Sequence, residues 1–268
     1  MSTFLSLPEL LSTLLGTAAL VQPALANGGW YQPAMDVNWQ VQLQGTPDTH
    51  YDMELYVLDL FDTEQSVIGG LHAQGAKMIC YFSAGTFENW RDDAGRFLPG
   101  DKGRRLGNWP GERWLDIRSQ NVREIMADRL DLAVEKGCDG VDPDNVDGYS
   151  NHTGLPLTYQ NQLDYNIWLA GEAHQRGLAV SLKNDLGQIQ DLVAHFDFAI
   201  NESCHEWDEC ELLTPFTQAG KPVLHIDYLY ANDPVGRDQL CLYTQGLGFR
   251  TLTLPELLDG SFRLSCNP

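Results

Sequence analysis

The stretch that decides the fold runs from residue 138 to residue 147 and reads Cys-Asp-Gly-Val-Asp-Pro-Asp-Asn-Val-Asp. It places four aspartates within ten positions, with no lysine or arginine among them: Asp139, Asp142, Asp144 and Asp147. Carboxylates this close repel one another, so folding gains little from the cluster and a functional site explains it better. A solvated acidic turn or a calcium loop is the alternative. The EF-hand pattern fails, because Val146 occupies a position that requires an oxygen ligand.

The same stretch predicts a short strand that ends at a chemical site. Residues 133–140 are typical of a helix end, a glycine turn and the start of a strand. Because side chains alternate along a strand, Asp142 and Asp144 share one face while Val141 packs on the other. Pro143 cannot donate a ladder hydrogen bond, which indicates the carboxyl end of the strand. In α/β barrels the catalytic side chains lie at that end of the strands.

The rest of the chain repeats this succession of strand and helix. Apolar runs predict further strands at 37–43, within 51–60, and at 77–82, 178–182, 196–201, 222–226 and 248–252. Apolar residues at helical spacing predict helices at 63–74, 117–135, 159–175, 186–195, 206–219 and 234–245. The strict alternation after residue 118 requires a parallel sheet. We therefore predict an α/β fold with one domain, a single (β/α)8 TIM barrel of eight strands.

One long segment, residues 83–115, fits neither a helix nor a strand. It holds six glycines and three tryptophans, Trp90, Trp109 and Trp114. A connection of this length inside a compact domain is either functional or a sign that an element has been missed. Aromatic side chains interleaved with glycine suggest a loop that lines a sugar groove. Tryptophans that anchor the loop in the core are the alternative.

Composition limits the classes of partner. The chain has 268 residues, 43% of them hydrophobic, and a (β/α)8 barrel takes about 250 residues. Seventeen lysines and arginines stand against thirty-seven aspartates and glutamates, a net charge of −20. Such a surface repels phosphate backbones, so no nucleic acid is expected as a partner, whereas a cationic ligand would be attracted. Solubility of a secreted protein is the simpler explanation of the charge taken alone.

Residues 1–26 differ from the rest of the chain. An apolar run at 11–21 is followed by Ala24-Leu25-Ala26, although no lysine or arginine precedes the run. A short apolar run before such a triplet predicts a signal peptide, cut after Ala26. The protein is then secreted, with its barrel domain over residues 27–268. No stretch is long and apolar enough for a transmembrane helix, so no membrane span is expected.

Six cysteines, an even number, suit an oxidising compartment. Two pairs are interpreted as disulfides: Cys204 with Cys210, and Cys241 with Cys266. Cys80 and Cys138 lie in or beside predicted strands and are interpreted as buried thiols. No pair has the spacing of a zinc site. The sequence gives no sign of a metal or an organic cofactor.

Polar side chains at the strand ends of a barrel converge over its mouth. Asp144 ends the fourth predicted strand, and Glu202 ends the sixth. Cleavage of a glycosidic bond needs two carboxyl groups, one acting on the anomeric carbon and one protonating the leaving oxygen. The apolar strand neighbours of Glu202 are expected to raise its pKa for the acid role, whereas Asp144, within reach of Lys183, is expected to stay ionised. A structural salt bridge is the alternative role for Glu202.

Other catalytic motifs are absent from the sequence. It contains no G-x-S-x-G nucleophile elbow and no glycine-rich phosphate loop. His205-Glu206 does not begin an H-E-x-x-H zinc motif, because Glu209 occupies the place of the second histidine.

Several short blocks, taken together and in order, resemble glycoside hydrolase family 114. They are YFSAG at 81–85, ENWR at 88–91, WLDIR at 114–118, GVDPDNVD at 140–147, LKN at 182–184 and NESC at 201–204. The resemblance covers about residues 30 to 255. Members of this family are endo-α-1,4-polygalactosaminidases with a TIM-barrel fold. The resemblance therefore implies an enzyme that cuts α-1,4-linked galactosamine polymers internally.

The resemblance also implies roles for individual residues. Asp144 corresponds to the nucleophile and Glu202 to the general acid/base, and we expect retention of configuration. Asp142 stands where the family often has glutamate, and we expect it to bind a substrate amine. The expected substrate-binding residues are Asp59, Tyr81, Trp90, Asp142, Asn145, Lys183, Asn184, Asp227 and Tyr228.

Galactosamine units without acetyl groups are cationic, which gives the acidic composition a physical reason. The expected partner is therefore a cationic or partly deacetylated galactosamine polysaccharide, bound by a monomer. A hydrolase of another α-linked glycan is one alternative. A barrel that binds carbohydrate without cleaving it is another.

Overall fold

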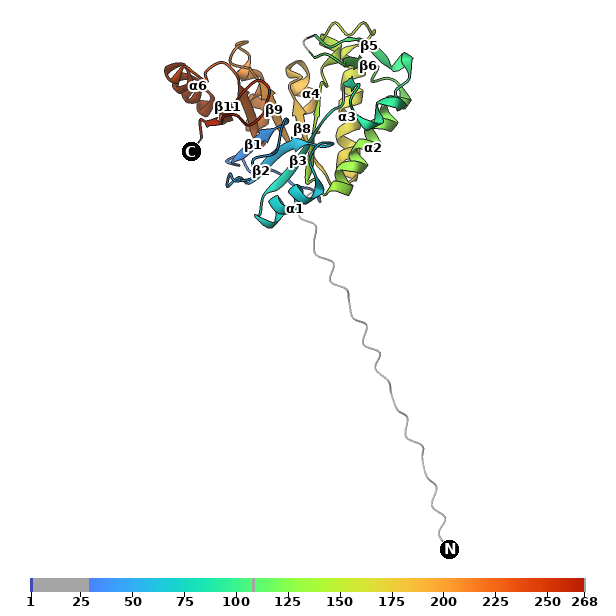
Figure 1. The fold of residues 1–268 in the computed structure, drawn as a ribbon, viewed down its shortest axis with the longest axis horizontal. Helices are drawn as coiled ribbons and strands as arrows, with labels where there is room; N and C mark the ends of the chain where they lie inside the picture. Colours follow the sequence, from blue (N-terminus) through green and yellow to red (C-terminus); the bar gives the residue numbers. More distant parts are fainter. Residues whose placement is uncertain (2–28, 108, 268) are drawn as a thin grey trace.

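The computed structural model describes residue 1, residues 29–107 and residues 109–267. Apart from residue 1, the predicted signal peptide lies outside these described residues. One curved sheet of nine strands forms the centre of the fold (Figure 1). Its eight parallel strands are β1 (Trp39–Gln42), β2 (Leu55–Asp59), β3 (Lys77–Ser83), β7 (Gly140–Asp144), β8 (Ala179–Lys183), β9 (Phe198–Glu202), β10 (Val223–Asp227) and β11 (Arg250–Thr253). The short β12 (Leu264–Ser265) pairs antiparallel with β11. The predicted barrel and its eight strands are confirmed.

Strands β1 and β11 meet through side-chain hydrogen bonds, which bring the two ends of the parallel sheet together. Trp39 Nε1 donates to the carbonyl oxygen of Arg250 at 3.0 Å, and Arg250 Nε donates to that of Val37 at 2.9 Å. Inside, alternate residues of the strands form one buried apolar cluster. Its members include Val41, Leu55, Val57, Ile79, Ala179, Phe198, Ile200, Leu224, Ile226 and Leu252. Burial of each large apolar side chain contributes about 1.5–3 kcal/mol, so this cluster holds the strand ends in fixed positions.

Helices cover the outside of the sheet (Figure 1). They are α1 (Gln65–Ala73), α2 (Gln120–Lys136), α3 (Tyr159–Gln175), α4 (Ile189–Leu192), α5 (Thr214–Gln218) and α6 (Pro234–Gly246). Two are shorter than predicted, because the 3₁₀ turns Leu186–Gln188 and Cys210–Leu213 take up the residues before α4 and α5. Within the described residues, none of the helices has the length and apolar character that a membrane crossing requires.

The segment predicted to be irregular, residues 83–115, contains a second sheet. Three antiparallel strands lie in the order β4 (Thr86–Glu88), β6 (Glu112–Leu115) and β5 (Lys102–Arg105). The prediction of an irregular loop is therefore wrong. Each strand has only three or four residues, too few for alternation of side chains to show in the sequence. This small sheet follows β3 directly, so it lies at the carboxyl end of the barrel strands.

All six cysteines form disulfides. Two of the bonds join the pairs interpreted as disulfides from the sequence, Cys204 with Cys210 and Cys241 with Cys266. The interpretation of Cys80 and Cys138 as free thiols is wrong, because they form the third bond. Strands β3 and β7 are neighbours in the barrel, and this brings the two Cα atoms to 6.0 Å across 58 positions of sequence.

Candidate active site

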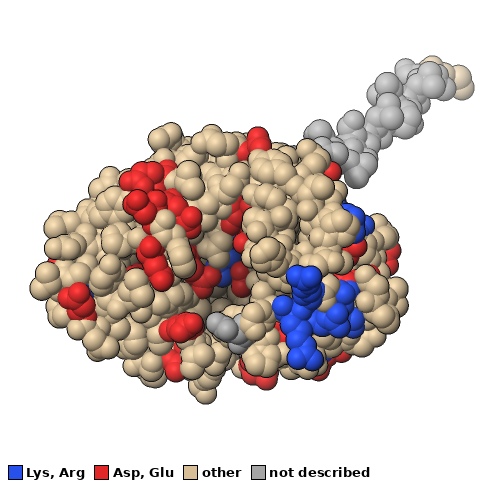
Figure 2. Space-filling model, turned by 90° about the horizontal axis from the view of Figure 1, so that it is seen from above, with Lys and Arg blue, Asp and Glu red and all other residues tan. Residues whose placement is uncertain are grey.

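Two adjoining cavities, of about 530 Å³ and about 300 Å³, open at the carboxyl ends of the barrel strands. Figure 2 shows acidic side chains gathered around this hollow. Both cavities are lined by the same central group: Tyr81, Trp109, Glu112, Asp144, Lys183, Glu202 and Glu256. The prediction that side chains from strands far apart in sequence converge here is confirmed for both Asp144 and Glu202.

Lys183, at the end of β8, lies between the two predicted catalytic carboxylates. Its Nζ is 3.2 Å from Asp144 Oδ1 and 3.1 Å from Glu202 Oε2. The lysine is almost fully buried, and burial opposes its charge, yet the two carboxylates hold the pKa of Lys183 above the usual value. Asp144 and Glu202 therefore face each other across one ammonium group.

Asp144 is held in place by three donors. Tyr81 Oη donates to Oδ2 at 2.9 Å, and the backbone N–H of Asn145 donates to Oδ1 at 2.7 Å, the same oxygen that Lys183 contacts. The side-chain amide of Asn145 donates to Ser83 Oγ at 2.9 Å. Asn145 therefore ties the end of β7 to the end of β3, and this contact fixes the carboxylate before it.

Glu202 also has three partners, and they decide its charge. Tyr228 Oη donates to Oε1 at 2.5 Å, Asn184 Nδ2 donates to Oε2 at 3.2 Å, and Lys183 contacts Oε2. Burial raises the pKa of Glu202, but the lysine and the two donors outweigh burial, so its pKa lies below the ordinary value. The prediction of a raised pKa is therefore wrong. The apolar neighbours on β9 are as expected, but donors from other strands reach the carboxylate.

The three adjacent strands β7, β8 and β9 end in the same way. The last residue of each carries a site side chain, and the next residue has a positive φ: Asn145 (61°), Asn184 (53°) and Ser203 (60°). Residues other than glycine rarely take this conformation, and those that do cluster at functional sites. The chain thus turns away immediately after Asp144, Lys183 and Glu202.

Gly85 lets the small sheet approach the end of β7 closely. The backbone N–H groups of Ala84 and Gly85 donate to the carbonyl oxygen of Asp144 at 2.8 and 3.1 Å. A Cβ atom on Gly85 would lie 1.7 Å from the carbonyl oxygen of Asn145, so no side chain fits there. The Gly85 carbonyl in turn accepts from the N–H of Leu115 on β6 at 2.9 Å.

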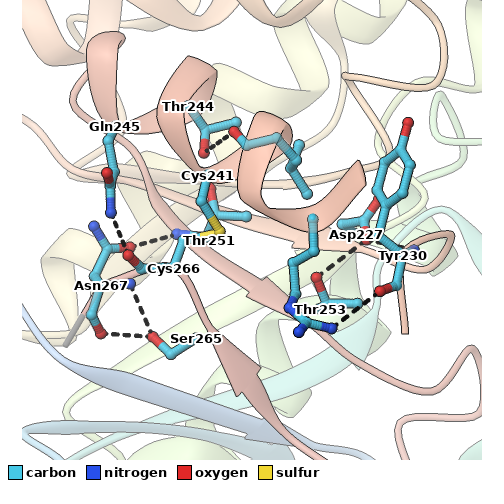
Figure 3. The surroundings of a disulfide bond; sticks show 12 residues. Asp227, Tyr230, Cys241, Thr244, Gln245, Thr251, Thr253, Ser265, Cys266 and Asn267 are labelled. Carbon is cyan, nitrogen blue, oxygen red and sulfur yellow. Dashed lines mark hydrogen bonds between the residues drawn. A yellow bond between two sulfur atoms is a disulfide. The ribbon is translucent and has the colours of Figure 1, made fainter. Parts of the chain in front are cut away.

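Two predicted substrate-binding residues lie below the cleft rather than on its wall. Asp142 is 2% exposed, accepts a hydrogen bond from Ser181 Oγ, and has its pKa raised to about 7 by burial. Asp227 is also 2% exposed and accepts from the backbone N–H of Tyr230 and from Thr253 Oγ1 (Figure 3). Neither aspartate lines either cavity. Asp227 instead fixes the loop after β10 that carries Tyr228.

The remaining predicted residues lie on the cavity walls. Tyr81 and Lys183 line both cavities, Asn145, Asn184 and Tyr228 line the larger one, and Asp59 and Trp90 line the smaller. Asp59 is already paired, because Arg91 Nη2 lies 2.6 Å from its Oδ2. The carboxylate of Asp59 therefore holds Arg91 in position, and its charge is already compensated by that arginine.

Sequence reasoning missed Glu112 and Glu256, which line both cavities. Glu112 begins β6, a strand that the sequence did not reveal. Its Oε2 accepts a hydrogen bond from Thr86 Oγ1 at 2.9 Å. Burial, together with the charges of Glu88 and Asp144, raises the pKa of Glu112 to about 7. Recognition of β4 and β6 as paired strands would have been needed to place this carboxyl group in the cleft.

An eight-stranded barrel with two carboxylates facing each other in a cleft at the strand ends is an arrangement found in glycoside hydrolases. The model of glycoside hydrolase family GH114 matches residues 21–267. The chain therefore belongs to family GH114, and the resemblance noted in the sequence is confirmed.

Solved structures agree with this membership. The crystal structure of Aspergillus fumigatus Ega3 in complex with galactosamine has 41% sequence identity and a TM-score of 0.84, over 88% of this chain and 97% of that one. The glycoside hydrolase domain of PelA from Pseudomonas aeruginosa has 16% identity and a TM-score of 0.71, over 85% of this chain and 98% of its own. At that identity PelA supports the fold alone. An uncharacterized protein of Deinococcus radiodurans is 27% identical in an alignment that covers 76% of this chain and 76% of that one.

Proposed function

We propose that this glycoside hydrolase is a secreted, endo-acting enzyme that cleaves α-1,4-linked galactosamine polymers with retention of configuration. The observation that carries the proposal is the position of Lys183, which contacts Asp144 and Glu202 at 3.2 and 3.1 Å inside an open cleft. Two carboxyl groups held this way supply the pair that glycoside hydrolysis requires.

The same contacts support retention. Both carboxylates contact the same Nζ atom of Lys183. The distance between the nearest oxygens of Asp144 and Glu202 therefore cannot exceed the sum of the two contact distances. That limit excludes the wider part of the roughly 6.5–9.5 Å range of inverting enzymes, in which a water fits between acid and base, and so favours the closer spacing of retaining enzymes. Direct attack by one carboxylate on the anomeric carbon is the chemistry that a short spacing favours.

In the proposed mechanism Asp144 attacks the anomeric carbon while Glu202 gives its proton to the leaving oxygen. A covalent glycosyl–Asp144 ester forms and the glycosidic bond breaks. Glu202, now ionised, takes a proton from water, which attacks the anomeric carbon and releases Asp144. Because the pKa of Glu202 is lowered, its acid form is populated at low pH, so we expect an acidic pH optimum.

The choice of substrate rests on charge and on one relative. Ega3, at 41% identity, was solved with galactosamine. The cleft carries several carboxylates, and the whole chain has a net charge of −20. A deacetylated galactosamine polymer is cationic, so this field would draw it to the cleft and hold it there.

A digestion experiment tests the proposal. The wild type, Asp144→Asn, Glu202→Gln and the exposed control Glu135→Gln are incubated with deacetylated α-1,4-galactosamine polymer and with chitosan. Oligosaccharides are detected by mass spectrometry, and the anomer formed first is identified by NMR. We expect α-anomeric oligosaccharides of several lengths from the galactosamine polymer, with wild type and control only.

Three outcomes would contradict parts of the proposal. Products from chitosan but not from the galactosamine polymer would assign a different glycan. If the first product is the β-anomer, the enzyme inverts the anomeric configuration and the proposal of retention is wrong. Equal release of oligosaccharides by the wild type and both site variants would show that Asp144 and Glu202 take no part in catalysis. If no protein released oligosaccharides, the alternative of a barrel that binds carbohydrate without cleaving it would be favoured.

A further inference from the structure

The small sheet carries a cluster of positive charge on a chain whose net charge is −20. Four basic residues lie on two neighbouring strands, Lys102, Arg104 and Arg105 on β5 and Arg113 on β6, and they form the basic patch. Its three arginines are exposed, and the strand register sets Arg105 directly opposite Arg113. Like charges in directly opposite positions destabilise a sheet, so folding does not explain the arrangement.

Many basic side chains outside the patch are compensated by carboxylates. Within the described residues, ion pairs engage Lys77, Arg91, Arg96, Arg118, Arg129, Arg176 and Lys183. No residue of the basic patch has an ion pair with any part of the chain that the structure describes. The acidic residues nearest to it in sequence, Asp101 and Glu112, are buried. The charge of the patch is therefore open to an anion from outside.

Local contacts shape the patch and leave donors unused. Arg113 Nε and Nη2 donate to the carbonyl oxygen of Gly103 at 2.9 and 2.6 Å, which fixes that guanidinium. The stem of Arg104 lies against Gly154, where a Cβ atom would be 2.7 Å from Arg104 Cγ. The guanidinium groups of Arg104 and Arg105 make no hydrogen bond to the described residues. Each therefore offers five N–H donors to a ligand.

The basic patch adjoins the cleft. Strand β5 is followed directly by Leu106 and Gly107, which line the larger cavity. Figure 2 shows lysine and arginine side chains gathered beside the hollow, around which acidic side chains lie. Neighbouring surfaces thus carry opposite charge, so the cleft attracts cations and the patch attracts anions.

The surroundings of the patch limit the shape of the anion. Arginine binds carboxylates through paired N–H donors. Charges act over about 10 Å at 0.1 M salt, so a membrane or a nucleic-acid duplex would also meet the repulsion of the acidic surroundings. A single polysaccharide chain can lie on the patch and turn away from them. Single-stranded nucleic acid is bound on aromatic platforms as well, and β5 has no aromatic residue.

We propose that the basic patch is a binding site for an anionic polysaccharide, whose carboxylate groups are bound by Arg104, Arg105 and Arg113. The site does not depend on which glycan the cleft cleaves. Cationic and anionic polymers associate through their charges. If the cleft takes a cationic chain as proposed, such an associate is bound by both of its components at once, which raises the local concentration of substrate.

Calorimetric titration with polygalacturonate, a polymer of carboxylated sugars, tests the site without any turnover. The variant Arg104→Gln/Arg105→Gln is compared with the wild type and with Arg96→Gln/Arg176→Gln, which removes the same total charge from ion pairs elsewhere. We expect the wild type and the control to bind polygalacturonate. The patch variant should bind about 30-fold more weakly, about fivefold for each charge lost beside a polyanion, with an unchanged Tm.

Further titrations separate the classes of anion. Neutral dextran should not bind, and the affinity for polygalacturonate should fall as salt rises. Absence of polygalacturonate binding by the wild type, equal binding by the patch variant, or an equal loss in the control would overturn the site. Tighter binding of phosphatidylserine vesicles or single-stranded DNA through the same arginines would overturn the assignment to a polysaccharide. None of these results depends on whether galactosamine polymer is cleaved.

Discussion

The ammonium group of Lys183 lies 3.1 Å from Glu202 Oε2, and this ion pair helps to hold the pKa of Glu202 below its ordinary value. A general acid with a lowered pKa loses its proton early as the pH rises. For the proposed role of Glu202 as the general acid, we therefore expect the basic limb of the pH–activity profile to lie at low pH.

Removal of that charge gives the first prediction. In Lys183→Met the pKa of Glu202 rises, so the basic limb of kcat/KM against pH should move up by about 1 pH unit or more. Activity at the optimum should fall about 100-fold, because the two carboxylates lose the group that positions them. Tyr228→Phe removes only one neutral donor and should move the limb in the same direction by less. An unmoved limb in Lys183→Met would contradict the assignment of Glu202 as the acid.

The roles of Asp144 and Glu202 can be separated by a substrate with an activated leaving group. Such a group needs no proton, so Glu202→Ala should still form the glycosyl-enzyme, and added azide should restore turnover. Asp144→Ala should release no α-glycosyl azide from the same substrate, because no glycosyl-enzyme forms; azide that takes the place of the missing carboxylate would give the β-anomer instead. Release of an α-glycosyl azide, followed by NMR, is the measurement. Rescue of Asp144→Ala with that same product would exchange the two roles.

Salt should weaken the capture of a cationic polymer. Charges on an exposed acidic rim act over about 10 Å at 0.1 M salt and over about 3 Å at 1 M. We expect kcat/KM on deacetylated polymer to fall steadily across that range, mainly through KM, with much less change for heavily N-acetylated polymer. Equal behaviour of both polymers would show that the net charge of −20 serves solubility rather than binding.

A buried carboxyl group behind the cleft should make stability depend on pH. Burial, and next the charge of Asp147, raise the pKa of Asp185 from 3.8 to about 8. The folded protein therefore binds this proton more tightly than the unfolded chain. Its stabilising contribution is complete below about pH 4 and is lost as the pH rises to about 8.

The variant Asp185→Asn tests this, because asparagine tolerates the positive φ of 44° at this position and does not titrate. In thermal unfolding, the Tm of the variant should rise relative to that of the wild type as the pH increases from about 4 to about 8. Over this interval the wild-type residue loses the stabilising effect of its bound proton. A constant difference in Tm across that interval would mean that Asp185 titrates normally.

The three disulfides should differ in their contributions to stability. Loop-closure entropy predicts about 4 kcal/mol for Cys80–Cys138, which spans 58 residues, and about 2 kcal/mol for Cys204–Cys210, which spans 6. Double alanine variants at each pair, compared by urea unfolding, measure the difference. A larger loss from the short loop would point to native packing rather than chain entropy as the origin.

The barrel strands could be predicted because each is a local event. A run such as Leu55–Leu58 is buried on both sides and bounded by polar residues, and its position needs no knowledge of distant residues. The site residues at the ends of β7, β8 and β9 followed from the same strands once a barrel was assumed.

What escaped prediction depends on contacts between distant parts of the chain. Cys80 meets Cys138 only because β7 pairs with β3, although the whole small sheet intervenes in sequence. Glu112 reaches the cleft only through the pairing of β6 with β4. The lowered pKa of Glu202 arises from Lys183 and Tyr228, which come from other strands, and no property of its own strand reports them.

The contact between Gly85 and Asn145 constrains the evolution of the enzyme. A substitution as small as alanine would push against a carbonyl group one residue from the proposed nucleophile, and shifts of about 1 Å at a reacting group can cost a hundredfold in rate. Relatives that keep the same catalytic site are therefore expected to keep glycine at position 85. Gly85→Ala is therefore expected to inactivate the enzyme while every side chain of the cleft stays unchanged.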